Sequence, residues 1–332
     1  MRLRLQCLLI CSLWSTLSCA ADTSYEAHPG AAAVIDELVA DEGFERDALL
    51  KVLAQAKRQE SILKAISRPA EKTKAWWEYR KIFLNQKRED QGVEFWQKHQ
   101  ETLARAEATF GVPASMIVSI IGVETYYGRI AGSYRVIDAL STLAFDYPRR
   151  SAFFTKELKH YLLLTRDQGL DPTQMKGSYA GAMGFGQFMP SSYRSYAIDF
   201  DGDGVTDIWN NPVDAIGSVA NYFKAHGWRA GEPVVFAAQA ENDNLPLDLF
   251  VQGRSGLKPE RTIAQFAEAG VKPLQPLDPQ ALATAMKFGL EAGFEYWLGL
   301  HNFYVITRYN HSAMYAMSVY QLSERLAARV AP

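Results

Sequence analysis

Cysteine and clustered histidine, the residues of disulfide frameworks and zinc sites, are scarce in this 332-residue chain. Its three cysteines, Cys7, Cys11 and Cys19, lie within the first twenty residues, so disulfide bonds in the mature protein are excluded. The six histidines are scattered and form no H-E-x-x-H pattern, which argues against a zinc hydrolase. The run from Gly177 to Gly181 is not a G-x-S-x-G nucleophile elbow, which argues against a serine hydrolase.

Strong charge of one sign and long apolar runs are also missing. The formal net charge of -2 argues against a protein that coats nucleic acid, and we expect no nucleic-acid partner. Beyond the N-terminus no run reaches the ~18 apolar residues of a membrane span. There is no low-complexity tract and no repeat of fixed period, which excludes the disordered and solenoid classes. The remaining composition, 48% hydrophobic and 22% charged, is that of an ordinary globular protein.

The N-terminus has the pattern of an export signal. Two arginines precede a mostly apolar stretch, so we expect residues 1–20 to be a signal peptide. Cys19 stands where a bacterial lipoprotein signal carries its cysteine, which predicts lipidation of Cys19 and an outer-membrane anchor in the periplasm. Cleavage near Ala20, which gives a soluble periplasmic protein, is the alternative. In both cases the chain leaves the cytoplasm.

The rest of the chain divides by its hydrophobic pattern. The segment from Ala114 to Val123 is apolar on nearly every side, as expected for a helix in the middle of a core. Two runs, Pro233 to Ala238 and Leu247 to Gln252, have the pattern of short strands. We therefore expect a mainly α (α+β) fold. The expected units are a helical domain (31–110), a core domain (111–230), a small β domain (231–278) and C-terminal helices that return to the core (279–332).

Glu124 is the strongest candidate for a catalytic residue. It ends the apolar helix, where desolvation favours the protonated carboxyl that a general acid needs. A structural glutamate paired with Arg129 is the alternative. The glycine-rich loop from Gly181 to Pro190 carries Gln187 and Phe188, which offer the hydrogen bonds and stacking face typical of sugar sites. Taken alone, this loop could be a plain turn.

Residues 199–214 resemble a calcium-binding EF-hand loop, with acidic residues at positions one, three and five and glycine at position six. The loop departs from the pattern at position twelve, where Asn210 replaces glutamate, so we expect Asp214 to supply the missing carboxylate. We predict a structural Ca²⁺ and no catalytic cofactor; a solvated acidic turn is the alternative. The expected ligands are Asp199, Asp201, Asp203, the carbonyl of Val205, and Asp214.

Four motifs carry a resemblance to a known family. They are Gly122-Val123-Glu124-Thr125, Tyr147-Pro148-Arg149-Arg150, the loop from Gly181 to Pro190, and Asn302-Phe303-Tyr304 followed by Thr307-Arg308-Tyr309-Asn310. Together they closely resemble the B-type membrane-bound lytic murein transglycosylases, over the chain from about residue 31 onward. The resemblance implies a lysozyme-like core flanked by a helical domain and a small β domain. It also implies cleavage of the β-1,4 bond between N-acetylmuramic acid and N-acetylglucosamine, with formation of 1,6-anhydromuramoyl ends during cell-wall turnover.

The resemblance further implies roles for matched positions. Glu124 would be the sole acid and base. For Tyr222 and Tyr315 a place in the hydrophobic core is the alternative, and for Arg149 and Arg150 a solvated face. The expected substrate-binding residues are Tyr79, Arg149, Arg150, Ser178, Gln187, Phe188, Tyr222, Tyr309, Asn310 and Tyr315.

The expected mechanism follows from a missing partner. Ordinary glycosidases use two carboxylates, yet nothing marks Asp138 or Asp146, the acidic residues nearest to Glu124 in sequence, as the second one. The 6-hydroxyl of the muramoyl sugar would then attack in its place. A muramidase that uses water, and a calcium-stabilised murein-binding module without turnover, are the other functions that fit. The expected partners are peptidoglycan strands, other murein synthases or hydrolases, and the outer membrane through Cys19.

Overall fold

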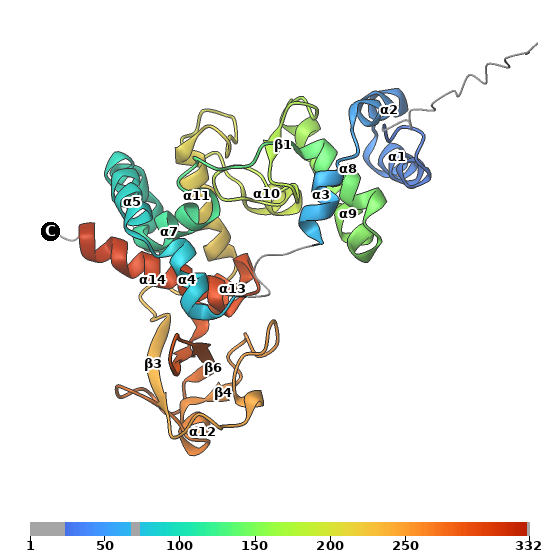
Figure 1. Cartoon of the computed structure of the whole chain (residues 1–332). Helices are drawn as coiled ribbons and strands as arrows, with labels where there is room; N and C mark the ends of the chain where they lie inside the picture. Colours follow the sequence, from blue (N-terminus) through green and yellow to red (C-terminus); the bar gives the residue numbers. More distant parts are fainter. Residues whose placement is uncertain (1–23, 68–73, 331–332) are drawn as a thin grey trace, which may run out of the picture.

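The computed structural model describes residues 24–67 and 74–330 (Figure 1). The expected signal peptide and Cys19 lie outside these residues. Helices dominate, and one small sheet stands apart from them, so the prediction of a mainly helical α+β fold is confirmed. Among the described residues no single helix is long and apolar enough to cross a membrane. Two helices, Gln100–Phe110 (α6) and Ala114–Thr125 (α7), meet that test only when joined across a bend of 113°.

The N-terminal part is a series of short amphipathic helices. The last of them ends at Phe110 because Gly111 takes a left-handed conformation (φ 71°) and its N–H bonds to Glu107, as the Gly-Val-Pro sequence predicts. The helices are α1 (Pro29–Glu42), α2 (Arg46–Gln55), α3 (Glu60–Ile66), α4 (Trp76–Phe83), α5 (Gln86–Lys98) and α6 (Gln100–Phe110).

The core is built around α7 (Ala114–Thr125). All of its residues except Ser115 and Glu124 are buried, which confirms the prediction of a central apolar helix. The other elements of this part are a two-stranded ribbon, β1 (Tyr134–Arg135) with β2 (Lys176–Gly177), and the helices α8 (Val136–Asp146), η2 (Pro148–Arg150), α9 (Ser151–Asp167), α10 (Pro190–Tyr196) and α11 (Pro212–Ala225).

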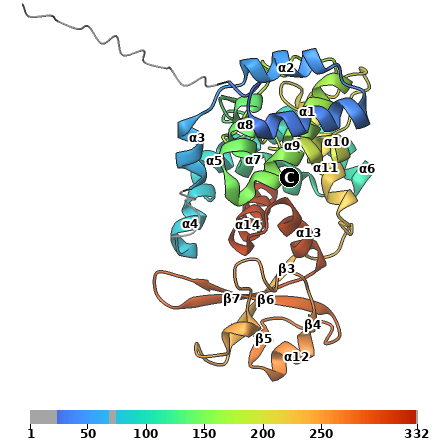
Figure 2. The same cartoon turned by 90° about the vertical axis from the view of Figure 1, so that its right-hand side faces the viewer.

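The sheet is antiparallel with strand order β4-β6-β7-β3-β5, and its own small hydrophobic cluster packs against α12. Figure 2 shows it as a separate layer below the helices. The elements are β3 (Val235–Ala240), η3 (Leu247–Leu249), β4 (Arg261–Thr262), α12 (Ile263–Glu268), β5 (Val271–Pro273), β6 (Leu282–Gly289) and β7 (Phe294–Gly299).

Two expectations about this region are wrong. Leu247 to Gln252 is not a strand: its first half is the 3₁₀ turn η3, and Phe250 makes only an isolated bridge to Ala285. Helices do not return directly after residue 278, because β6 and β7 form a hairpin there. The alanine- and methionine-containing β6 has weak strand propensity, and its pairing with the aromatic β7 overrides that local preference.

Two final helices bring the chain back to the core. α13 (His301–Tyr309) leads from the sheet, and α14 (Ala313–Val330) packs against α7, α5 and α4. Ser119 of α7 donates a hydrogen bond to the carbonyl of Val319 in α14 at 2.6 Å, deep in the core. The pair α7–α14 is therefore the centre on which the candidate site is built.

Candidate active site

Glu124 is the penultimate residue of α7 and is half-buried. The chain turns sharply after it, because Tyr126 (φ 56°) and Tyr127 (φ 61°) both take the left-handed conformation that ends the helix. The Tyr127 ring folds back over Gly122, where a Cβ atom would stand 2.6 Å from the ring. Glycine at position 122 is therefore what permits this close turn beside the carboxylate.

The Glu124 carboxylate is held by a neighbouring helix. The Tyr315 hydroxyl of α14 donates to Oε1 of Glu124 at 2.5 Å. Arg129, the alternative partner, instead forms an exposed ion pair with Glu94 at 3.2 Å. Glu124 is thus fixed by a buried phenol, as a proton-transferring carboxyl in a shaped site would be.

Tyrosines surround this carboxylate. Burial, and then the negative charge of Glu124, raises the pKa of Tyr309 and of Tyr315 well above the usual value. Burial, with a smaller effect of Tyr196, also raises the pKa of Tyr222. All three phenols therefore stay protonated at neutral pH and serve as neutral hydrogen-bond donors.

Three of the predicted sugar-binding residues pack together, but Phe188 and Tyr222 are buried in the hydrophobic core, which for Tyr222 was the alternative, and only Tyr309 is half-buried. The rings of Tyr222 and Tyr309 lie 4.6 Å apart, and Phe188 lies 5.7 Å from the first and 6.1 Å from the second. The Tyr309 hydroxyl donates to the carbonyl of Gly186 at 2.6 Å, and that of Tyr222 to the carbonyl of Arg308 at 2.7 Å. Both hydroxyls thus fix backbone of the site.

The polar residues of the glycine-rich segment hold its shape. The Ser178 hydroxyl accepts the N–H of Ala182 at 3.0 Å, which closes the turn that begins the loop. Gln187 has a left-handed backbone (φ 51°), and its amide donates to the carbonyls of Ala131 and Gly184, both at 3.1 Å. The loop is thus a fixed structure rather than a plain turn.

The remaining predicted binding residues lie in different surroundings. Tyr79 is fully buried, with 1% of its surface exposed, and its helix α4 packs against α14, so it belongs to the core that supports the site and does not line it. Asn310 is half-buried at the end of α13. Arg149 and Arg150 are exposed on η2, and a contact with substrate remains a prediction for them.

Sequence reasoning missed Arg88 of α5. This buried guanidinium donates to the carbonyl of Gly122 in the last turn of α7 and lies 4.3 Å from the centre of the Tyr126 ring. Burial lowers the pKa of Arg88. The signal was present, because Arg88, Gly92 and Phe95 follow the i, i+4, i+7 spacing of a buried helix face.

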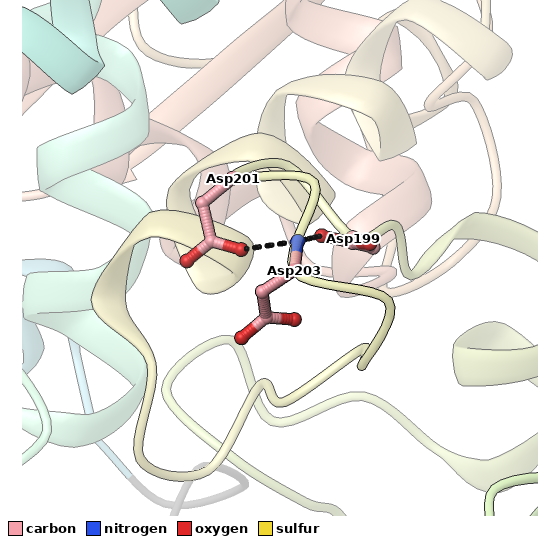
Figure 3. A group of neighbouring side chains, drawn as sticks. All are labelled: Asp199, Asp201 and Asp203. Carbon is pink, nitrogen blue, oxygen red and sulfur yellow. Dashed lines mark hydrogen bonds between the residues drawn. The ribbon is translucent and has the colours of Figure 1, made fainter.

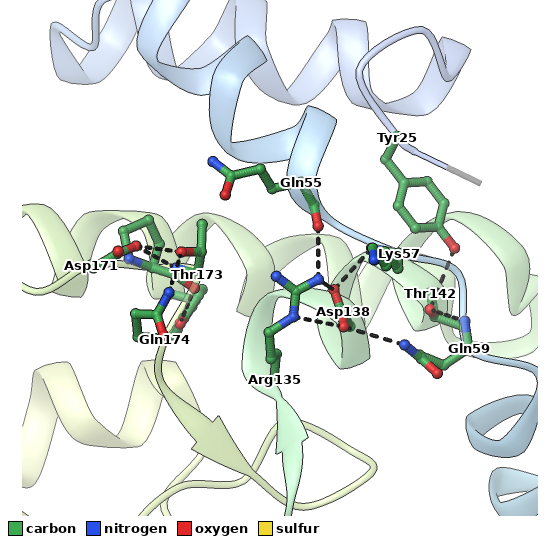
Figure 4. Close-up of polar contacts among 12 residues, drawn as sticks. Tyr25, Gln55, Lys57, Gln59, Arg135, Asp138, Thr142, Asp171, Thr173 and Gln174 are labelled. Atoms are coloured by element: carbon green, nitrogen blue, oxygen red, sulfur yellow. Dashed lines mark hydrogen bonds and ion pairs between the residues drawn. The ribbon is translucent and has the colours of Figure 1, made fainter. Parts of the chain in front are cut away.

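Asp138 and Asp146, the candidates for a second carboxylate, are engaged elsewhere, and Figure 4 shows the contacts of Asp138. Asp138 is buried, accepts the N–H of Lys57 at 2.8 Å and forms a two-oxygen ion pair with Arg135 at 2.7 and 3.0 Å. Asp146 accepts a hydrogen bond from the hydroxyl of Tyr25 and forms an ion pair with Arg58 at 3.3 Å. Both carboxylates fasten the N-terminal segment to α8.

The acidic loop gathers three of its predicted ligands (Figure 3). One carboxylate oxygen from each of Asp199, Asp201 and Asp203 lies within 4.8 Å of the others. Asp199 accepts the N–H groups of Gly204 and Gly202, at 2.8 and 2.7 Å, and these bonds lower the pKa of Asp199. Three carboxyl groups on a tight loop form a donor set suited to a hard, oxygen-binding cation.

Asp214 does not belong to that group. It is completely buried in the first turn of α11, and its two oxygens accept the N–H groups of Phe200 and Asp207, both at 2.8 Å. Burial raises the pKa of Asp214. The residue thus ties together the beginning and the end of the acidic loop. Val205 is exposed, and its N–H donates to Asp203.

Comparison with known proteins gives consistent matches. Residues 26–324 match the model of the transglycosylase SLT domain. Membrane-bound lytic murein transglycosylase B of Escherichia coli (strain K12) is 47% identical over 313 residues, which cover 91% of this chain and 84% of that protein. The soluble lytic transglycosylase SltB1 of Pseudomonas aeruginosa is 54% identical, with a TM-score of 0.85 over 91% of this chain and 99% of that one. The E. coli lytic transglycosylase SLT35 in complex with calcium is 47% identical, with a TM-score of 0.83 over 92% and 95%.

Proposed function

Because this chain belongs to the transglycosylase SLT domain family, we propose that Glu124 is the catalytic acid and base of its reaction. The protein is a lytic murein transglycosylase, an enzyme that cleaves glycosidic bonds of peptidoglycan in cell-wall turnover. The observation that carries the assignment of Glu124 is its place at the end of a buried helix, bonded to Tyr315 within a cluster of neutral phenols.

The reaction proceeds with one carboxyl group. Glu124 protonates the oxygen between N-acetylmuramic acid and N-acetylglucosamine, and that bond to C1 breaks. The muramoyl 6-hydroxyl attacks C1 and gives its proton back to Glu124, so the products carry a 1,6-anhydro ring and no water is consumed. The tethered hydroxyl has a large effective concentration, up to about 10⁵–10⁸ M in well-oriented cases. The engagement of Asp138 and Asp146 in other contacts supports this route over one with two carboxylates.

Replacement of Glu124 by glutamine tests this proposal. Glu124→Gln keeps the size of the side chain but removes the transferable proton, so we expect loss of nearly all activity in a folded protein that still binds murein. Mass spectrometry of the wild-type products should show muropeptides lighter by one water than hydrolysis products. Reducing muramic acid ends as the main product would instead identify a muramidase, and binding without any product would identify a binding module.

The remaining expected residues form the walls of the substrate site in this proposal. Tyr309 presents its half-buried ring, with Phe188 and Tyr222 packed behind it, and Asn310 and the glycine-rich loop supply polar groups. Ser178 and Gln187 act through the fixed shape of that loop, and Tyr79 through its packing behind Tyr315. Arg149 and Arg150 offer their exposed guanidinium groups to carboxylates or sugar oxygens of the substrate.

The acidic loop binds Ca²⁺ in a structural role in this proposal. Asp199, Asp201, Asp203 and the carbonyl of Val205 would hold the ion, and Asp214 fixes the loop below it. The presence of calcium in the E. coli relative supports this choice of metal. The bound ion would cancel the mutual repulsion of the carboxylates and so rigidify the segment that leads into α11.

Murein lies outside the cytoplasmic membrane, so the enzyme acts in the periplasm, and its E. coli relative is membrane-bound. We propose that this chain is held at the outer membrane through a lipid on Cys19. Cys19→Ala should then move the protein from the membrane fraction to the soluble periplasmic fraction. A wild-type protein that is already soluble and begins at Ala21 would show that the anchor does not exist.

A further inference from the structure

A cavity of about 590 Å³ lies where the helices meet the sheet, and nothing in the proposed reaction uses it. Its volume falls in the range of about 300–1,000 Å³ that is usual for small-molecule sites. The start of α7 with Ser115 and the middle of α14 with Tyr320 and Glu324 form one side. The sheet forms the other side with Trp297 of β7 and the strand β3. We call this space the interdomain cavity.

The interdomain cavity is separated from Glu124 by most of the length of α7. α7 begins at the cavity and carries Glu124 in its last turn, whereas α14 begins near the active site and passes the cavity at Tyr320. From Ser115 to Glu124 the rise along α7 is about 14 Å, at about 1.5 Å per residue. The cavity therefore lies at the start of α7, at the end of that helix opposite to Glu124, and is a site of its own.

Aromatic side chains line much of the cavity. Trp297 is half-buried and faces the same side of the sheet as Ala237, its partner across the β3–β7 ladder. Trp228 and Tyr320 contribute further aromatic surface. Trp228 is buried and forms the floor, whereas Trp297 and Tyr320 are only half-buried. Their accessible ring surface fits the C–H faces of a sugar ring.

The charges at the cavity restrict the chemical class of ligand that can bind there. Two carboxylates, Glu232 and Glu324, lie among its lining residues, and no lysine, arginine or histidine does. Glu232 is paired with Arg229 at 3.4 Å, whereas Glu324 is exposed at the rim beside Tyr320, whose pKa is raised by burial and by that carboxylate. Carboxylates accept hydroxyl groups and repel anions, so phosphates and acidic peptides do not fit this surface.

We propose that the interdomain cavity is a second carbohydrate-binding site that takes an N-acetylated sugar of a glycan strand. This inference rests on the proposed function, which supplies a polymeric sugar substrate. An additional contact on the same polymer raises the effective concentration of the strand at the catalytic cleft, because the second binding event is intramolecular. The site should therefore matter for intact murein and little for short soluble fragments.

A titration reads the site without any turnover. The Glu124→Gln protein labelled with 5-fluorotryptophan is titrated with tetra-N-acetylchitotetraose and followed by ¹⁹F NMR. We expect the resonances of Trp297 and Trp228 to shift, whereas that of Trp77, which lies on α4 over Lys81, stays in place. Trp297→Ala should weaken this binding at least tenfold, the effect of losing a stacked ring. Unmoved Trp297 and Trp228 resonances at saturation would overturn the proposal.

A rim variant tests the consequence for activity without touching the core. Glu324→Arg places a long cation at the mouth of the cavity, and Ala328→Arg, one turn further along exposed α14, is the matched control. We expect Glu324→Arg to slow release from insoluble murein at least threefold and to leave turnover of soluble fragments within twofold. An equal effect on both substrates, or none on either, would overturn the proposal, as would binding of a lysine-containing tetrapeptide in place of the sugar. Failure of the wild type on both substrates would refute the proposed function, while the titration would still decide the cavity.

Discussion

Replacing Arg88 by methionine tests how the end of the catalytic helix is held. The guanidinium of Arg88 is buried, donates to the carbonyl of Gly122 and packs on the ring of Tyr126. Within the described ranges it makes no ion pair with a carboxylate. Methionine has a similar length and keeps the apolar contacts, so Arg88→Met removes the charge and its hydrogen bond and little else.

The expected loss of stability follows from these contacts. A hydrogen bond from a charged donor contributes about 1.5–3 kcal/mol, and a cation–π contact about 0.5–2 kcal/mol. The variant also gains some stability, because it no longer buries a charged group that has no acidic partner. That burial is what lowers the pKa of Arg88 in the wild type. We therefore expect a net loss of about 1–3 kcal/mol in the free energy of unfolding. Each kcal/mol lost should lower Tm by about 2–4 °C.

The loss of activity should be larger than the loss of stability suggests. Gly122 lies two residues before Glu124, and a shift of about 1 Å at a reacting group costs as much as ~10²-fold in rate. We expect kcat on soluble muropeptides to fall at least tenfold with little change in KM, and Arg88→Lys to recover part of it. Lys98→Met, at the exposed end of the same helix, is the control. Wild-type kcat and Tm in Arg88→Met would show that Arg88 does not hold the helix end.

Three other predictions concern the acidic loop and the contacts of Asp138 that fasten the N-terminal segment to α8. Chelation should lower Tm, and Ca²⁺ at a hundredfold excess over Kd should restore about 2.7 kcal/mol of unfolding free energy. The Tm of Asp201→Asn should respond weakly to Ca²⁺, and that of the distant surface variant Asp248→Asn should respond as in the wild type. Identical melting curves with and without chelator would exclude the metal. Because its backbone bonds give Asp199 a lower pKa in the folded state, its contribution to stability should be complete above about pH 4 and be lost as pH falls further, which acid titration of the metal-free protein measures. Asp138→Asn should cost about 3 kcal/mol in urea unfolding, since it removes the buried carboxylate that pairs with half-buried Arg135, and a cost below 1 kcal/mol would contradict a role of Asp138 in fastening the N-terminal segment to α8.

The sequence was sufficient where local pattern and tertiary role coincide. The segment from Ala114 to Val123 is apolar all round and is the central helix, and Glu124 at its end lies among the expected tyrosines. The acidic spacing of Asp199, Asp201 and Asp203 likewise produced the expected cluster. Short-range pattern was enough for the helix and the acidic cluster, whereas the tyrosines around Glu124 were expected only from the family resemblance.

Prediction failed where distant partners decide the outcome. The strands β6 and β7 form because each pairs with the other and β3 completes the sheet, which no local propensity of residues 282–289 reveals. Asp214 was expected as a metal ligand because its spacing from Asp199 fits a lengthened loop. Only the fold shows that its two oxygens accept backbone N–H groups of Phe200 and Asp207. Arg88 resembles a surface residue by type, and its role depends on the carbonyl of Gly122 in another helix.

The packing of α14 on α7 has a consequence for how the protein is made. The bond from Ser119 to Val319 spans 200 residues of sequence, and Tyr309 and Tyr315 also come from the late part of the chain. Contacts of such long range form late in folding, because the intervening chain must first be ordered. Until α14 has docked, α7 therefore exposes an apolar surface, and Glu124 lacks its phenolic partner. A wall-cutting enzyme built in this way is inert until its last helix has docked.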